Sequence, residues 1–184
     1  MSSLIYPAFG PIHRLGLKIV REWFAQVEHD GRKVTVGSRI PEDLSDKLPF
    51  VMVRADRRSG AQSFRSGDER FLKTSLLSIE TFTTGLNAEN DGYDLQESVR
   101  LALWHAWHDQ VTVPDAGSIS KILNSSEASL VSDYATSTGV VQYASLPKGA
   151  ARTEAIYQVF TRPPAAESIT NPFIPKQLGA ELGT

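Results

Sequence analysis

The chain has 184 residues, of which 41% are hydrophobic and 22% charged, and its 19 basic and 21 acidic residues give a formal net charge of −2 at pH 7. These values are ordinary for a soluble globular domain, and they exclude a collagen-like, disulfide-stapled or wholly disordered chain and a strongly basic nucleic-acid binder. The absence of cysteine excludes disulfides, thiolate catalysis and cysteine-ligated metals. No apolar run approaches the roughly 18 residues of a membrane span, and the first residues do not resemble a secretory signal, so we expect a soluble protein.

The first half of the chain predicts one helix and three strands. Apolar residues between Ile12 and Val27 recur at spacings of three and four, which predicts an amphipathic helix over residues 12–29 that stops at the turn Asp30–Gly31. After this helix come, in order, a short strand over 33–38, a polar turn over 41–47, a strand buried on both faces over 48–54, a long polar loop over 55–70 and a long strand over 71–84.

The second half predicts another helix and then mostly strands. The helix begins near Asn90 or Asp91 and ends near Asp109, and its spacing gives a buried face made of Leu95, Val99, Ala102, Leu103 and Ala106. We interpret residues 111–114 as a loop. The segments that follow predict strands over 118–124, 129–134, 139–145 and 153–162, the last of which is stopped by Pro163–Pro164.

The order of these elements predicts the fold class. Helix, strands, helix and strands with short late connections are typical of an α+β fold. We therefore expect a mostly antiparallel mixed sheet with two main helices packed on one face. We also expect one domain over residues 1–163 and an extended C-terminal tail over 164–184, because the tail has no periodicity.

Few residues are candidates for chemistry. No G-x-S-x-G, P-loop or G-x-G-x-x-G pattern occurs in the sequence. His105, His108 and Asp109 offer two imidazoles and a carboxylate, which are metal ligands. The alternative is that both histidines lie in the last turn of the second helix, where imidazolium complements the negative end of the helix dipole. We favour this alternative and predict no metal, no other cofactor and no enzymatic activity.

Two acidic clusters and one aromatic pair also have simple explanations. The acidic residues at 42–46 and 68–69 lie in predicted loops, where solvated side chains are expected. Trp104 and Trp107 share one side of the predicted second helix, which is typical of core or interface packing.

Charge is segregated along the chain. Residues 1–84 carry 13 basic and 10 acidic side chains, residues 85–139 carry 2 basic and 8 acidic, and residues 140–184 carry 4 basic and 3 acidic. Chains with separate basic and acidic surfaces can pair head to tail, and such contacts close into rings when the rotation allows. The simpler alternative is that both surfaces are solvated.

Several segments together resemble a known family. They are the strand Leu48-Pro-Phe-Val-Met-Val-Arg54, the glycine-containing loop after it, the strand Leu76–Phe82, the helix Leu95–Trp107 and the closing strand Ala155–Arg162 with its Tyr-x-Val-x-x-Arg ending. This pattern resembles the tail terminator (tail completion) proteins of long-tailed, non-contractile bacteriophages, most closely those of phages that infect actinobacteria. It covers roughly residues 10–163 and contains no catalytic signature.

The resemblance implies a structural protein of the virion neck that assembles in the cytoplasm of a bacterial host. Members of the family form a hexameric ring that caps the finished tail tube, stops its polymerisation and joins it to the head–tail connector or stopper protein. The implied partners are therefore further copies of the chain, the major tail tube protein and that connector. No membrane and no sequence-specific nucleic acid is implied, although DNA has room to pass through the ring lumen. The residues that we predict to lie at interfaces are Arg57, Arg58, Phe64, Arg65, Phe173, Ile174 and Leu178.

Two alternatives to a terminator remain open at this point. The nearer one is another neck component, such as a head completion (stopper) protein, which also forms oligomers and has no catalytic site. The other belongs to a different class, a metal-dependent hydrolase that uses His105, His108 and Asp109.

Overall fold

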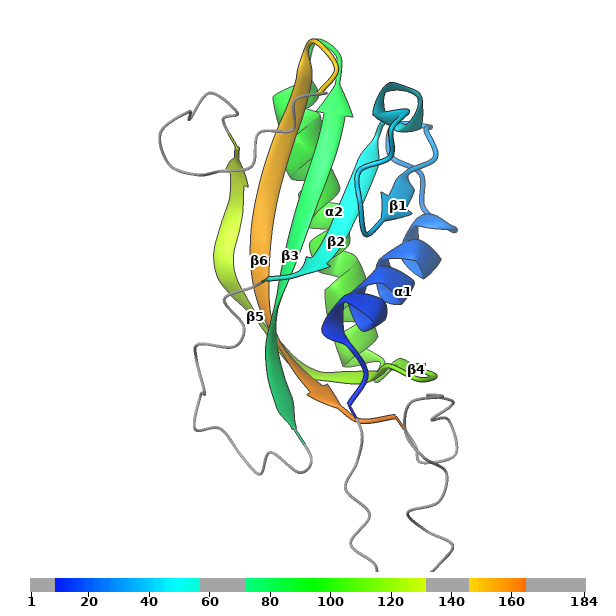
Figure 1. The fold of residues 1–184 in the computed structure, drawn as a ribbon, viewed down its shortest axis with the longest axis vertical. Helices are drawn as coiled ribbons and strands as arrows, with labels where there is room; N and C mark the ends of the chain where they lie inside the picture. The colour runs from blue at the N-terminus through cyan, green and yellow to red at the C-terminus, as the bar shows by residue number, and fades with distance from the viewer. Residues whose placement is uncertain (1–8, 57–71, 132–145, 165–184) are drawn as a thin grey trace, which may run out of the picture.

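The computed structural model describes residues 9–56, 72–131 and 146–164 (Figure 1). Its elements, in chain order, are α1 (Ile12–Phe24), β1 (Thr35–Gly37), the 3₁₀ helix η1 (Leu44–Lys47), β2 (Phe50–Ala55), β3 (Lys73–Thr84), α2 (Ala88–His108), β4 (Thr112–Val113), β5 (Gly117–Leu130) and β6 (Ala150–Arg162).

The strands form one mixed sheet. Their order is β1-β2-β3-β6-β5-β4, and β1 runs parallel to β2 whereas all other neighbours are antiparallel. The central pair is the longest, with β3 and β6 in continuous register from Lys73 opposite Thr161 to Thr84 opposite Ala150. This arrangement confirms the predicted α+β class with its mostly antiparallel mixed sheet.

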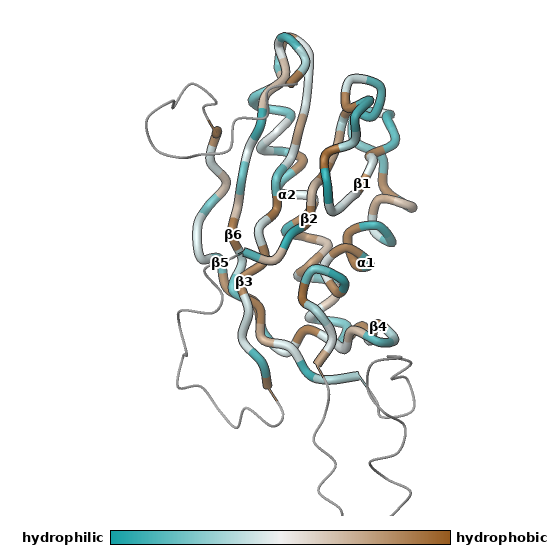
Figure 2. The backbone as a smooth tube through the Cα atoms, viewed as in Figure 1, coloured by the Kyte–Doolittle hydropathy of each residue, from teal (hydrophilic) through white to brown (hydrophobic). Residues whose placement is uncertain are grey.

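Both helices pack on the same face of the sheet and enclose the main core. Alternate residues of the strands point to this face, among them Val51 and Val53 of β2 and Leu77 and Ile79 of β3. Hydropathy along α1 alternates between apolar and polar residues, as an amphipathic helix requires (Figure 2). The residues predicted to form the inner face of α2 are all buried: Leu95, Val99, Ala102, Leu103 and Ala106.

A glycine lets α2 lie close to the centre of the sheet. A Cβ atom at Gly92 would sit 3.0 Å from the Thr153 methyl group, so a larger residue would push the helix outward. The Gly92 carbonyl accepts hydrogen bonds from the hydroxyls of Thr81 (3.2 Å) and Thr153 (3.3 Å). The buried Gln96 amide donates to the Ile79 carbonyl at 2.9 Å. Polar contacts therefore fix the position of α2 along the strands as well as its distance from them.

Three elements differ from the sequence prediction. The helix predicted to reach His29 ends at Phe24, because residues 29–32 form a tight turn in which His29 and Arg32 exchange backbone hydrogen bonds and Asp30 and Gly31 adopt positive φ. The predicted loop at 111–114 contains the short strand β4. The strands predicted at 118–124 and 129–134 are wrong as separate elements, since β5 runs unbroken from Gly117 to Leu130 with three register shifts against β6.

The remaining expectations fall outside the described residues. These include the strand predicted at 139–145 and the tail beyond Pro164. The long loop predicted after β2 also lies there almost entirely. Of the two helices that are described, neither is long and apolar enough to cross a membrane.

Candidate interaction surfaces

The last turn of α2 brings the predicted chemical candidates together. His105 and His108 both face Asp109, with His105 Nε2 at 3.2 Å from Asp109 Oδ2 and His108 Nδ1 at 2.8 Å from Asp109 Oδ1. The hydrogen bond from His108, with the electrostatic attraction of the two neighbouring imidazoles, holds the pKa of the Asp109 carboxyl below its ordinary value. The two histidines therefore lie at the helix end, as the alternative to a metal site expected.

These residues do not form a recognisable metal centre. Among residues 9–56, 72–131 and 146–164, no group of three or more histidine, aspartate or glutamate side chains is placed to hold a metal ion. Both imidazoles and the carboxylate are instead exposed and contact one another at the surface.

Aromatic side chains surround the same helix end. Trp104 and Trp107 are perpendicular, with ring centroids 5.8 Å apart, and His108 stacks on Trp104 at an interplanar angle of 12°. Trp23 of α1 lies against His105, with ring centroids 5.8 Å apart, and its indole donates to Ser98 Oγ at 3.1 Å. The Trp104 side chain is 48% exposed, so this ring does not pack inside the core.

The two helices carry opposite charge on their solvent sides. On α1, Arg14, Lys18 and Arg21 are exposed, and the first turn contains no acidic residue. On the first half of α2, Glu89, Asp94 and Glu97 are exposed. Glu97 is paired with Arg100 on its own helix, and among the described residues no ion pair joins α1 to α2. The charge segregation seen along the sequence therefore places mainly basic side chains on the solvent side of α1 and acidic side chains on the first half of α2.

The other face of the sheet contains a buried charge. Glu80 of β3 is fully buried and its carboxylate accepts hydrogen bonds from Arg152 Nε of β6, at 2.7 Å, and from Arg54 of β2. Glu154 lies directly opposite Glu80 in the register and accepts a hydrogen bond from Ser78 at 2.8 Å. Two carboxylates on adjacent strands repel each other, so the arginines stabilise this arrangement.

A small apolar cluster lies beside this charged group on the same face. It consists of Leu44, Phe50, Met52 and Phe82. Phe50 and Phe82 contact each other with ring centroids 5.9 Å apart. The face away from the helices is therefore partly apolar and partly ionic.

One edge of the sheet is long and open. The inner side of β5 pairs with β6, whereas its outer side pairs with β4 only at Gly117 and Ser118. Beyond these two positions no described residue pairs with the outer side of β5, and the side chains of Leu123 and Leu130 on this strand are exposed. Exposed strand edges are templates for pairing with another chain, and the register shifts of β5 limit this by bending the strand.

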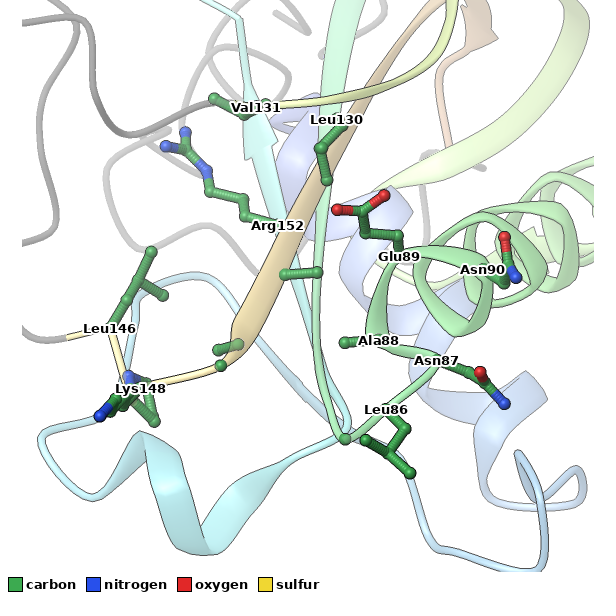
Figure 3. A pocket seen from close by; sticks show the side chains of 15 residues that line it. Leu86, Asn87, Ala88, Glu89, Asn90, Leu130, Val131, Leu146, Lys148 and Arg152 are labelled. Carbon is green, nitrogen blue, oxygen red and sulfur yellow. The ribbon is translucent and has the colours of Figure 1, made fainter.

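A hollow of about 720 Å³ lies at the end of the fold where α2 begins. It is bounded by the β3–α2 turn, the end of β5 and the start of β6, and Leu86, Leu130 and Leu146 are among the residues around it (Figure 3). The Glu89 side chain points from the helix towards the strands, whereas Asn90 points away (Figure 3). Leu86 is fully exposed, which is unusual for a large apolar side chain in a turn.

The predicted interface residues are not placed by the structure. Arg57, Arg58, Phe64 and Arg65, as well as Phe173, Ile174 and Leu178, lie outside the described residues. Sequence reasoning missed the exposed Leu86 and the buried Glu80. The signal for Glu80 was present, because it is a single carboxylate inside the apolar run 76–82, but its partners are distant in sequence.

Comparisons with known proteins add no relative. No protein-family model matches the chain, and a search of curated proteins finds no significant match. The fold is therefore defined by its own geometry, an α+β domain with two helices on one face of a six-stranded mixed sheet.

Proposed function

We propose that the chain is a tail terminator of a long-tailed, non-contractile bacteriophage, whose copies form a hexameric ring on the tail tube. On this proposal the ring stops polymerisation of the tube and joins it to the head–tail connector in the virion neck. The protein is then structural, with no catalytic role, and it assembles in the cytoplasm of the bacterial host. The proposal rests on the sequence pattern described above and on the surfaces of the fold.

The observation that carries the proposal is the opposite charge of the exposed sides of α1 and α2. A ring needs two different surfaces on each subunit that fit each other on neighbouring copies. Lys18 on α1 and Asp94 on α2 are both exposed, and neither takes part in an ion pair or side-chain hydrogen bond within the described chain. We infer that the basic side of α1 on one copy contacts the acidic side of α2 on the next.

Two further surfaces would add area to such contacts. The open edge of β5 and the hollow beside Leu86 each expose groups that usually lie at interfaces. Stable rings bury about 2,000 Å² or more of total surface at each contact, so one charged surface alone would be too small. These surfaces suit a stopper protein equally well, and no observation favours the hydrolase.

A charge-swap experiment tests the inferred contact. Lys18→Glu and Asp94→Lys, made singly, place like charges across each contact and should shift the full-length protein from ring to monomer in sedimentation velocity. The double variant restores opposite charges in reversed order and should recover the ring. Lys33→Glu, at an exposed lysine that lies on neither helix and outside the hollow, is the matched control and should leave assembly unchanged.

The role at the tube is tested with the same proteins. Purified tail tube protein polymerises in the presence of each variant, and tube lengths are measured by negative-stain electron microscopy. We expect short, capped tubes with the wild type and the double variant, and long tubes with either single variant. Tubes of equal length with and without the wild-type protein would refute the terminator proposal, even if the chain forms rings.

A further inference from the structure

All three tryptophans of the chain gather at one end of the molecule. Trp104 and Trp107 lie on the last turns of α2, and Trp23 approaches the same turns from α1 through His105. The three differ in environment, because the Trp23 indole donates a hydrogen bond to Ser98, whereas the indole nitrogens of Trp104 and Trp107 donate none to the described residues. Trp104, which is 48% exposed, and His108, which stacks on it, form an open aromatic surface. The half-buried Trp107 borders this surface, because it stands perpendicular to Trp104 and packs against the main core.

The last described residues of the chain lie beside this surface. Arg162, the last residue of β6, donates from Nη1 to Gln110 Oε1 at 3.0 Å, and Gln110 in turn donates to the Trp107 carbonyl at 2.6 Å. The end of β6 is held tightly there, because a Cβ atom at Gly117 would sit only 2.0 Å from the Arg162 carbonyl oxygen. In Figure 1 the end of β6 lies next to β4, at the end of the molecule where α2 finishes.

The segment that follows contains a proline motif. The described chain ends at Pro164, and Pro172-Phe-Ile-Pro175 comes eight residues later. Proline fixes φ near −65° and favours the left-handed polyproline II helix, which has three residues per turn and therefore presents Pro172 and Pro175 on one side. Surfaces lined by tryptophan and other aromatic rings bind P-x-x-P segments because the ligand is already ordered and loses little entropy.

We propose that Pro172–Pro175 of the same chain docks on the aromatic surface formed by Trp104 and His108 and bordered by Trp107. Eight extended residues reach up to about 26 Å. The link from Pro164 is therefore long enough for the motif to reach the aromatic surface, because the end of β6 already lies beside it. A link this short also gives an effective concentration on the order of millimolar, which favours the chain's own motif over that of another copy. This inference is independent of the proposed function, since it needs neither a ring nor a tail tube.

The indole N–H signals of the full-length protein test the inference directly. In protein labelled with ¹⁵N-tryptophan, three side-chain cross-peaks are expected, and single Trp→Phe variants assign them. The variant Pro172→Ala/Phe173→Ala/Pro175→Ala should move the Trp104 and Trp107 peaks, while the Trp23 peak keeps its position as an internal control. Unchanged Trp104 and Trp107 peaks would overturn the proposal.

Two controls define the occupant. The variant Glu167→Ala/Ser168→Ala changes the segment outside the motif, and Ile5→Ala/Tyr6→Ala changes the apolar N-terminal segment; neither should move the Trp104 and Trp107 peaks. Labelled motif variant is also mixed with unlabelled wild-type protein. If the wild-type chain restores the peaks of the labelled variant, the motif acts between copies and the assignment to the same chain is wrong.

Discussion

Replacing Glu80 by glutamine should lower the free energy of unfolding by about 3 kcal/mol, because it removes the negative charge from a buried ion pair, and breaking such a pair is strongly destabilising. The side chains of Glu80 and Arg152 are 1% and 5% exposed, and their closest atoms are 2.7 Å apart. The side chain of Arg54, the second partner, is 42% exposed, so water screens its contribution. We therefore expect Arg152→Met to cost about as much as Glu80→Gln, and Arg54→Met to cost about 1 kcal/mol.

The assay is urea unfolding followed by circular dichroism, with the midpoint and the slope fitted separately. For a chain of this length, 3 kcal/mol corresponds to a fall in Tm of about 6–12 °C. Glu154→Gln is the matched control, since it makes the same change at the cross-strand neighbour, which is only half-buried and bonded to Ser78. A loss below 1 kcal/mol for Glu80→Gln, or equal losses for the two arginine variants, would refute this reasoning.

Three other predictions concern the helix–sheet interface. Leu103→Ala removes a fully buried side chain from α2 and should cost about 2–5 kcal/mol in the same urea assay. Gly92→Val crowds Thr153 and should cost about 1–3 kcal/mol, and a neutral result would show that α2 shifts freely on the sheet. Burial raises the pKa of Tyr157 to about 12, which outweighs the opposing effect of Arg100. Because the folded state holds this proton more tightly than the unfolded state, the free energy of unfolding should fall between pH 10 and pH 12. In the Tyr157→Phe variant the free energy of unfolding should fall less over the same range.

The periodic parts of the fold were predictable from sequence. The spacing of apolar residues predicted the inner face of α2, and the apolar run 48–54 predicted that β2 is buried on both faces. Both predictions succeed because buried positions are occupied by apolar residues, which are visible in the sequence. The end of α1 was not predictable in this way, since the apolar spacing continues to Val27 although the chain already turns towards the bridge of His29 with Arg32.

Irregular and long-range features escaped the sequence prediction for a different reason. The register shifts of β5 interrupt its alternation, so one strand looked like two. Glu80 stands out in an apolar strand, but Arg152 lies 72 positions further along the chain and only the β3–β6 register brings them together. The sequence showed that basic and acidic residues are concentrated in different segments of the chain. Only the structure shows that these residues lie on the exposed sides of α1 and α2.

Native mass spectrometry of the full-length protein, alone and with tail tube protein, tests the central proposal most directly. The proposal predicts a closed hexamer, either in solution or on the tube. It also predicts that neither the Lys18→Glu variant nor the Asp94→Lys variant forms this hexamer. A protein that stays monomeric at every concentration and in the presence of tube protein would contradict the ring, and with it the proposed role in the virion neck.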